Sequence, residues 1–505
     1  MFPLQNPLRS LFYKTKMFSE RRLCDSYLII STNVFAFLRT VKKMNNSIID
    51  ISSKSTRADF WRRYGKLLLT IAFQNVIVYG VNLLDNIMIG RYSELSLSGV
   101  FIVNQIQFLL QMIVNGISDG TVVISSRHWG EKNIAGIKKT AACGLIFGLS
   151  VSGALMIFAL AAPTPLLSIF TDKAYVIEEA TKYLRIVCFS YVFFAATQVL
   201  MGMLRSVESA FVGFIGSCAS LLVNLVLNYI FIFGKFGAPE MGIKGAALAT
   251  LAARIVETGI IIGYIAFFDK KLNVKAAELF RTTKEAAGKF VRVSLPVVLS
   301  GTSWGIAMGM QTAILGRLTD PVISANSIAS TVFQIISVFS YGSATAASVM
   351  IGKTIGEGKE AGPDVLKKEI MHRAHVLQII FLCIGTATGL ALFLFKDFII
   401  GFYNITPDTM TLAVQFMTVL SVTVIGSSYQ MPCLTGIVRG GGDTKFVLFN
   451  DIIFMWCIVL PSSFAAAFVF ELHPVFIFIC LKADQILKCF VAMVKVNSGN
   501  WMKKI

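Results

Sequence analysis

The chain has 505 residues, of which 55% are hydrophobic and 15% are charged. A soluble domain carries about 25% charged residues, so this composition excludes a soluble globular protein and indicates one that lies mostly within a lipid bilayer. The formal net charge of +18 does not require a nucleic-acid partner, because basic loops beside anionic lipid headgroups account for it.

Residues 1–60 differ from the rest of the chain and are predicted to form a basic tail that is disordered or lies at the membrane surface. Their one apolar run, at about 27–38, is too short to cross a bilayer. It has the length of a signal-peptide core, but Arg39 and Lys42 follow it instead of a small-residue cleavage site. A second interpretation stays open, in which translation starts at Met44 and the preceding residues are not native.

The remainder is predicted to be all-α, because its apolar stretches reach the length of about 20 residues that a membrane-spanning helix needs. The twelve predicted spans are 67–90, 97–125, 139–162, 181–204, 211–234, 242–268, 291–316, 322–352, 372–396, 408–437, 446–470 and 473–494. They define four segments after the tail: a six-helix bundle over 61–268, a linker over 269–290, a second bundle over 291–495 and a tail over 496–505.

The second bundle repeats the first. Gly90, Gly116 and Gly130 are each followed by a glycine 226 residues later, and the stretch 200–205 resembles 434–439 at a shift of 234. Anchors in the same order with one small insertion indicate a duplicated unit. Because each unit has an even number of spans, both enter the membrane from the same side. We therefore predict a pseudo-two-fold axis along the membrane normal, with the substrate path between the halves.

Lysine and arginine gather in alternate loops, as at Arg127 and Lys132 after the second predicted span and throughout 269–290. Positive residues stay cytoplasmic, so both termini are predicted to be cytoplasmic. The segment 269–290 interleaves charged residues with apolar ones such as Leu279 and Phe280, which predicts an amphipathic helix on the cytoplasmic surface.

Carboxylates within the spans are candidates for ion coupling, since burying a charge costs at least about 2.5–3.5 kcal/mol. They are Asp85, Asp119, Glu257, Asp451 and Asp484. Asp85 is the strongest candidate, because no cation lies within reach along its own helix. Its equivalent 226 residues later is Gln311, so the site is acidic in one half only.

The other carboxylates have simpler explanations. Asp484 is followed one turn later by Lys488, which favours a structural ion pair. Asp451 and Glu257 are expected to lie close to the lipid headgroups.

The fifth predicted span carries two amides one turn apart, Asn224 and Asn228. Residues at i and i+4 share a helix face, and amides within lipid must find partners. They either hydrogen-bond a facing carboxylate such as Asp85 or hold helices together. The residues alone leave these two interpretations open.

Motifs for other sources of energy are absent from the sequence. It has no Gly-x-x-x-x-Gly-Lys-Ser/Thr stretch, so there is no sign of an ATP site. His372 and His375 are at helical spacing but lack a thiol or carboxylate cluster, so no metal site is predicted. We predict a transporter and not an enzyme, without a cofactor, driven by an ion gradient.

Several short stretches, in order, resemble the multidrug and toxic compound extrusion (MATE) transporters of bacterial type. They are Leu84–Gly90, Leu204–Ser206, Asn224–Gly234, Gly242–Thr250, Arg439–Thr444 and Ser498–Trp501. The resemblance covers about 60–505. It implies a monomeric antiporter of the bacterial inner membrane that exports cationic or amphipathic organic compounds in exchange for protons or sodium. Its partners would be these compounds and membrane lipid, with no nucleic acid.

The resemblance also implies site residues. Asp85 matches the acidic residue on the first helix that couples transport to protons or sodium, and Asn224 matches the amide of an Asn-x-x-x-Asp motif. Asn228 stands where that motif has its aspartate, so one acid is missing. The polar network and substrate path are predicted to include Tyr183, Thr250 and Gln311. Acids that another branch of the family uses in spans seven and ten are absent from this sequence.

A second function stays open, that of a flippase for a lipid-linked or other amphipathic substrate of the same superfamily. Such a flippase would need a cationic lumen for a phosphorylated headgroup, whereas Lys and Arg here lie mostly in loops. A membrane scaffold or receptor is disfavoured by the polar residues within spans. For the antiporter we expect a cavity lined by aromatic and methionine side chains, which attract flat organic cations.

Overall fold

The computed structural model describes residues 54–358, 363–401, 403 and 405–503. The chain divides into two compact units, 1–59 and 60–505, and the fold described here is that of the second. The apolar run at 27–38 and Met44 lie outside the described residues. Regular structure in the described part of the chain is helical, apart from one bridge between Gly442 and Met502.

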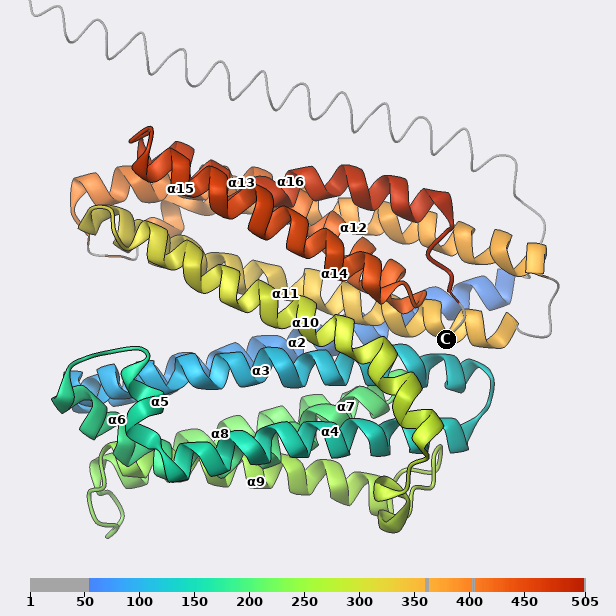
Figure 1. Cartoon of the computed structure of the whole chain (residues 1–505), viewed down its shortest axis with the longest axis horizontal. Helices are drawn as coiled ribbons and strands as arrows, with labels where there is room; N and C mark the ends of the chain where they lie inside the picture. The colour runs from blue at the N-terminus through green and yellow to red at the C-terminus, as the bar shows by residue number, and fades with distance from the viewer. Residues whose placement is uncertain (1–53, 359–362, 402, 404, 504–505) are drawn as a thin grey trace, which may run out of the picture. The chain divides into compact units, whose positions relative to one another are not determined.

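The first half contains the helices that precede the linker (Figure 1). They are α2 (Lys54–Tyr92), α3 (Glu94–Gly130), α4 (Ile134–Ala161), α5 (Pro163–Ser168), α6 (Ala174–Val187), α7 (Ser190–Ser206), α8 (Phe211–Phe233) and α9 (Ile243–Phe267). Helices α6 and α7 meet at a bend of 51° and pass together as one candidate span.

The second half follows a short 3₁₀-helix, η1 (Ala276–Phe280). Its helices are α10 (Lys284–Leu315), α11 (Asp320–Glu357), α12 (Pro363–Ile400), α13 (Pro407–Met431), α14 (Thr444–Ile452), α15 (Leu460–Phe468) and α16 (Pro474–Ser498). Two π-helical turns, η3 (Pro432–Val438) and η4 (Ile453–Val459), continue α13 and join α14 to α15. The candidate spans accordingly include 407–438 and 444–468 as single segments.

The predicted all-α membrane fold is confirmed. Among the described residues, ten helices are long and apolar enough to cross a membrane, and the bent pair α6–α7 makes eleven. Helix α16 completes the twelve: it has 25 residues, or about 37 Å at 1.5 Å per residue. What sets this helix apart from the other spans is three charged residues in its apolar stretch, Lys482, Asp484 and Lys488, and all three are buried in the bundle.

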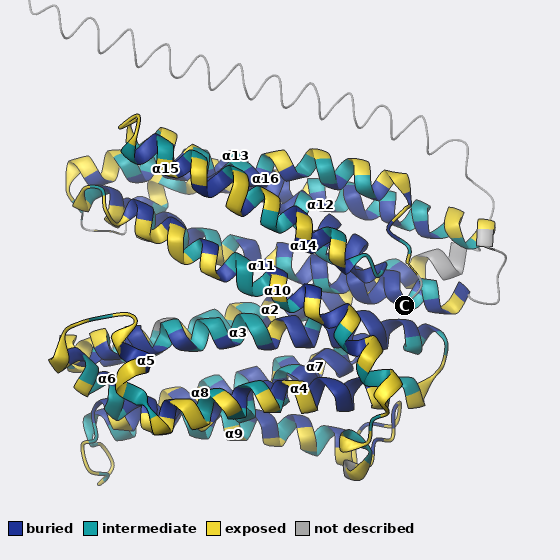
Figure 2. Ribbon diagram, in the orientation of Figure 1, coloured by how far each residue is buried: buried dark blue, intermediate teal, exposed yellow. Residues whose placement is uncertain are grey.

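Exposed residues occur along the helices of both halves (Figure 2), and many of them have large apolar side chains. Leu222, Leu394, Phe490 and Val494 are each more than 60% exposed. In water such an apolar surface would drive association, but next to lipid tails it is the ordinary surface of a spanning helix.

Close contacts between α3 and α11 show the pseudo-two-fold relation between the halves. A Cβ on Gly130 would lie 2.1 Å from the carbonyl oxygen of Lys353, and a Cβ on Gly356 would lie 2.2 Å from that of Arg127. Gly356 is the counterpart of Gly130 at the shift of 226, and Lys353 is the counterpart of Arg127 at the same shift. An interface in which i contacts j and j contacts i is the signature of two-fold symmetry.

The same symmetry extends to neighbouring helices. Gly116 of α3 packs against Val298 of α10, and its counterpart Gly342 of α11 packs against Ala72 of α2, where Val298 and Ala72 also differ by 226. Two of the three glycine repeats, Gly116/Gly342 and Gly130/Gly356, therefore mark places where helix backbones approach so closely that a Cβ has no room, whereas Gly90 and Gly316 meet no backbone of another helix.

The segment between α9 and α10 differs from the predicted amphipathic surface helix. It holds only η1, and α10 already begins at Lys284, where Thr283 accepts a hydrogen bond from the Ala286 backbone. Lys138 of α4 bonds Glu278 at 2.7 Å and the backbone oxygen of Asn273 at 3.0 Å. These contacts to α4 hold a short turn in place.

The described end of the chain is docked in the bundle. Trp501 is fully buried against Gly441, and its indole Nε1 donates to the Val496 carbonyl at 2.9 Å. Arg127 of α3 donates to the carbonyls of Gly441 and Lys503 at 2.6 and 2.7 Å. A side chain of the first half thus binds the final turn of the second.

Candidate functional site

A cavity of about 570 Å³ lies between the two halves. Its walls come from α2, α3, α6, α8 and α9 of the first half and from α10 and α11 of the second. It reaches Asn86, Val100 and Phe170, toward the end of the bundle at which α2 passes into α3. The volume is in the range of a small-molecule site.

Asp85 lies in the wall of this cavity and is held by amides. The side-chain nitrogen of Asn228 donates to the Asp85 carboxylate and, at 3.1 Å, to the side-chain oxygen of Asn224. Both asparagines are almost fully buried. The expected contact between the fifth-span amides and Asp85 is therefore present, with helix α8 presenting both amides to α2.

The amide pair has bonding capacity left over. Within the described structure, Asn224 Nδ2 and Asn228 Oδ1 have no hydrogen-bond partner. A buried polar atom without a partner costs about 1–3 kcal/mol, so it tends to mark a place where a ligand or proton binds. Here an unsatisfied acceptor oxygen belongs to the same side chain that already donates to Asp85.

Two of the other three predicted network residues line the cavity, and the third does not. Tyr183 of α6 and Thr250 of α9 line the same cavity as Asp85. Gln311 is buried in α10 and is not among the lining residues, whereas Met308, Gly309 and Thr312 of that helix are. Gln311 is the counterpart of Asp85 in the sequence repeat, but the two do not share the cavity, because more of the cavity wall comes from the first half.

A second polar chain, centred on Glu257, was not found from the sequence. Glu257 was expected near the headgroups, but it is only 2% exposed. It accepts hydrogen bonds from Arg254 of its own helix at 2.8 Å and from Ser217 of α8 at 3.1 Å. The physical reason is that the bundle surrounds this turn of α9, and hydropathy cannot show which face of a helix is enclosed.

The series of hydrogen-bonded side chains extends from Ser217 toward α2 and α7. Gln74 of α2 donates to Ser217 at 3.3 Å and accepts from Arg205 of α7 at 3.2 Å. Ser217, Arg254 and Glu257 line the cavity, whereas Gln74 and Arg205 do not. Polar contacts therefore run from the cavity wall into the packed part of the first half.

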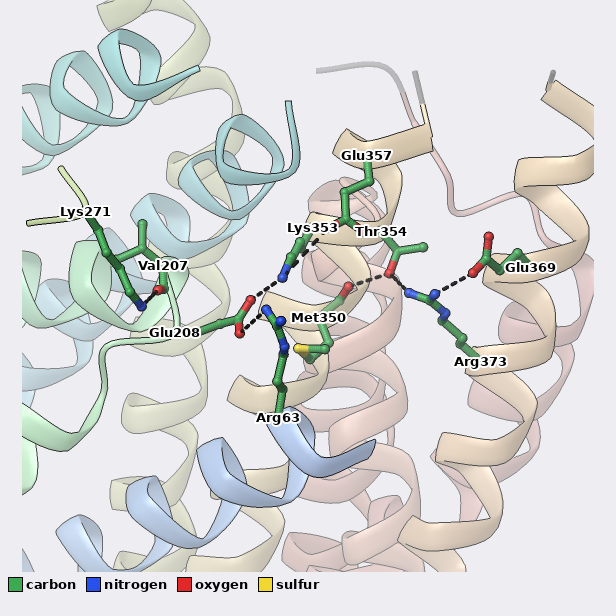
Figure 3. Close-up of polar contacts among 10 residues, drawn as sticks. All are labelled: Arg63, Val207, Glu208, Lys271, Met350, Lys353, Thr354, Glu357, Glu369 and Arg373. Atoms are coloured by element: carbon green, nitrogen blue, oxygen red, sulfur yellow. Dashed lines mark hydrogen bonds and ion pairs between the residues drawn. The ribbon is translucent and has the colours of Figure 1, made fainter. Parts of the chain in front are cut away.

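Ion pairs join the two halves at the end of the bundle where α3, α7 and α11 terminate, which we call the closed end, and a second pocket of about 610 Å³ lies there beside α3, α4 and α10. Glu208, in the turn after α7, bonds Lys353 of α11 and, at 3.2 Å, Arg63 of α2 (Figure 3). Burial opposes ionisation of Glu208, but the bond to Lys353 and the two positive charges outweigh it, so the pKa of Glu208 is lowered. This ion cluster joins the two halves.

Two further features support this closure. Arg439 of the second half pairs with Asp119 of α3 at 3.1 Å. Glu208 has φ of 59°, a left-handed conformation that is uncommon outside glycine and costs of order 1–3 kcal/mol. Its ion pairs hold it there.

A known family matches both halves of the chain. The MatE family model covers residues 70–230 and 298–465. The chain belongs to the MatE family, the MATE transporters. It is therefore a transporter and not an enzyme.

Curated relatives and solved structures agree with this MATE assignment. The chain is 25% identical over 445 residues to a probable multidrug resistance protein NorM of Thermotoga maritima, covering 87% of this chain and 92% of that protein. A probable NorM of Listeria monocytogenes is 25% identical, covering 86% and 94%. An outward-facing multidrug resistance MATE transporter has a TM-score of 0.77 at 19% identity, covering 86% and 96%.

A MOP-superfamily transporter from Pyrococcus furiosus is equally similar in fold, with a TM-score of 0.77 at 20% identity, covering 88% of this chain and 96% of that one. At these identities the solved structures establish the MATE fold alone.

The wall of the MATE cavity differs from the expected aromatic and methionine lining. Among the described residues, only three aromatic residues and one methionine line the cavity, whereas eight residues with carboxamide side chains do. They are Asn82, Asn86, Asn104, Gln105, Gln107, Gln111, Asn224 and Gln334. Asn104, Gln107 and Gln111 follow one another at helical spacing on one face of α3. Hydropathy hides these amides because their apolar neighbours on α3 dominate the window.

Proposed function

We propose that this MATE transporter is a secondary antiporter that exports cationic organic compounds in exchange for protons or sodium, with Asp85 as the coupling group. The observation that carries the proposal is the position of Asp85. It lines the cavity and accepts a hydrogen bond from the neutral amide of Asn228, which is itself bonded to Asn224. A carboxylate without a fixed cation is available to a proton, a sodium ion or a substrate cation, which would compete for it.

The amides provide a way for the site to respond. When Asp85 is ionised, the nitrogen of Asn228 donates to it. When Asp85 is protonated, its O–H needs an acceptor, and rotation of the Asn228 amide would present the oxygen that now lacks a partner. Asn228 can therefore serve both states, although it replaces the second acid that the family resemblance implies.

Loop charges support an orientation for this proposal. The closed end carries Arg63, Lys353 and Lys271 (Figure 3), and by the positive-inside rule it faces the cytoplasm. The cavity would then be reached from outside, in a bacterial plasma membrane. The chain is proposed to work as a monomer, since one chain supplies both halves of the cavity wall.

The wall also indicates the kind of substrate. Carboxamides both donate and accept hydrogen bonds, so we propose organic cations that carry hydroxyl, amine or amide groups in addition to an apolar body. The relatives named multidrug resistance proteins support a broad range of compounds. A flippase for phosphorylated headgroups is less well supported, because the charged residues that line the cavity in the described part of the chain are two acids and one paired arginine.

Purified protein in sealed vesicles tests the proposal. We expect uptake of an organic cation such as ethidium when a proton or sodium gradient is imposed in the opposite direction, and release of the gradient when substrate is added. One gradient acting alone would identify the ion. Transport under neither gradient, together with translocation of a labelled phospholipid-linked sugar, would overturn the antiporter and favour the flippase.

A further inference from the structure

Arg254 and Glu257 form an ion pair in the wall of the cavity. Both lie on α9, three residues apart, with Arg254 Nη1 and Glu257 Oε2 separated by 2.8 Å. The Ser217 hydroxyl donates to the other oxygen of Glu257 at 3.1 Å, and the Arg254 guanidinium lies 5.2 Å from the centre of the Phe194 ring. The pair is therefore held in one geometry by α8 and α7.

The pair determines the charge of the cavity. Among the described residues that line it, the charged ones are Asp85, Arg254 and Glu257. Arg254 contacts Glu257 directly, and its charge also acts on Asp85, whose hydrogen-bond donor is the neutral amide of Asn228. With both carboxylates ionised, the net charge is −1, and it resides at Asp85.

We infer that the Arg254–Glu257 pair sets the cavity charge to −1 and thereby selects singly charged organic cations, each exchanged for one coupling ion. The inference rests on the proposed antiport. A charge in a poorly hydrated site is unfavourable unless it is compensated. One monocation or one coupling ion neutralises the cavity, whereas a dication leaves it at +1 and a neutral compound leaves it at −1.

A purely structural explanation accounts less well for the pair. Both partners belong to one helix, so their ionic bond does not tie α9 to another span. Replacing a buried ion pair by neutral residues of similar size is often neutral or stabilising, so stability alone does not require it. Its position in the wall of the cavity is what a charge-setting role requires.

Three variants in sealed vesicles test this inference: R254Q, E257Q and R254Q/E257Q. The substrates are ethidium, a monocation, and methyl viologen, a dication, under a clamped gradient of the coupling ion. R254Q makes the cavity −2, and we expect the ratio of methyl viologen to ethidium transport to rise about tenfold. That is the scale on which one unit charge acts over roughly 10 Å at an effective dielectric constant of about 20.

The other two variants test the sign and the sum of the charges. E257Q makes the cavity neutral, so ethidium transport should fall about tenfold. R254Q/E257Q restores −1, and both the ratio and the ethidium rate should return toward the wild type. The matched control is R373Q/E369Q, which removes another intrahelical pair outside the cavity and should leave the ratio unchanged.

Two outcomes would overturn the inference. A ratio that stays constant in R254Q while both rates fall equally would show a structural role, as would a double variant that is less active than either single one. R254M serves in place of R254Q if the latter does not give a monodisperse protein. Failure of the wild type to move either cation under any gradient would instead refute the proposed antiport, which keeps the two failures distinct.

Discussion

The two halves of the molecule use equivalent positions for opposite electrostatic purposes. Each has a chain of three polar side chains on its first, fifth and sixth spans. They are Gln74, Ser217 and Glu257 in the first half and Ser300, Asp451 and Lys488 in the second. In the first half the acid faces a cavity, whereas in the second a lysine lies between two acids.

The second-half lysine accounts for the difference. Lys488 Nζ lies 3.0 Å from Asp451 and 3.5 Å from Asp484, so the ion pair expected for Asp484 is present and also includes Asp451. Asp451, expected near the headgroups, is partly buried and is held by this contact and by a hydrogen bond from Ser300. A carboxylate with a fixed cation cannot exchange ions easily. One duplicated scaffold thus keeps one acid, Asp85, available in the first half, where Glu257 is paired with Arg254, and uses its acids for cohesion in the second half.

The largest expected effect comes from removing the available acid. D85N keeps the size of the side chain and its contact with α8, so the protein should fold and bind substrate. Without an ionisable group, gradient-driven export should fall to the level of vesicles without protein. The matched control is Q311N, the equivalent position in the second half, which should transport normally. Normal export by D85N under a clamped gradient would place coupling elsewhere.

Removing the fixed cation of the second half should act on stability. K488M leaves Asp451 and Asp484 without their cation, and breaking a buried pair costs about 3–5 kcal/mol. K482M is the control on the same helix, because Lys482 stacks on Phe333 and Phe478 at 5.3 and 5.6 Å. We expect a clear fall in thermal unfolding temperature for K488M and a smaller one for K482M. Equal losses would contradict the comparison.

The contact on the pseudo-two-fold axis offers a smaller test that concerns both halves equally. In G130A, a methyl group would meet the Lys353 carbonyl, and such overpacking costs about 1–3 kcal/mol. The closed end should loosen, which faster hydrogen exchange in residues 350–357 would report. Gly153 of α4 has open space around it, so G153A should be neutral or slightly stabilising. Unchanged exchange in G130A would show that α3 and α11 can move apart at this contact without loosening the closed end.

The smallest expected effect concerns Glu208 in the closed-end cluster. E208Q should destabilise the closure by about 1 kcal/mol, since the cluster is partly exposed. Because ion pairing lowers the pKa of Glu208 in the fold, its contribution is fully present above the unfolded value of about 4.3 and is lost as pH falls below it. The protection factors of the amides of residues 350–357, which correct for the pH dependence of intrinsic exchange, should therefore be constant from pH 8 to pH 5 in the wild type. A loss of protection already at pH 6 would assign closure to another group.

Much of the fold could be predicted from the sequence because it depends on local properties. Spans follow from the length of apolar runs, and the repeat follows from glycines at a constant shift. The contact of Asp85 with Asn224 and Asn228 could be anticipated because two amides one helical turn apart within lipid require a polar partner. Whether they serve ion coupling stays a prediction.

Tertiary structure alone decided the rest. The pair of Arg254 and Glu257, at i and i+3 of one helix, could have been read from their spacing, but hydropathy could not say that this turn of α9 faces Ser217 inside the bundle, because that depends on how each helix is rotated and crossed by its neighbours. For the same reason the sequence placed Gln311 in the substrate path and expected aromatic walls, where packing instead presents the amides of α3. Apolar length determines which segments enter the membrane, but the close approach of helix backbones at glycines such as Gly130 determines which side chains meet.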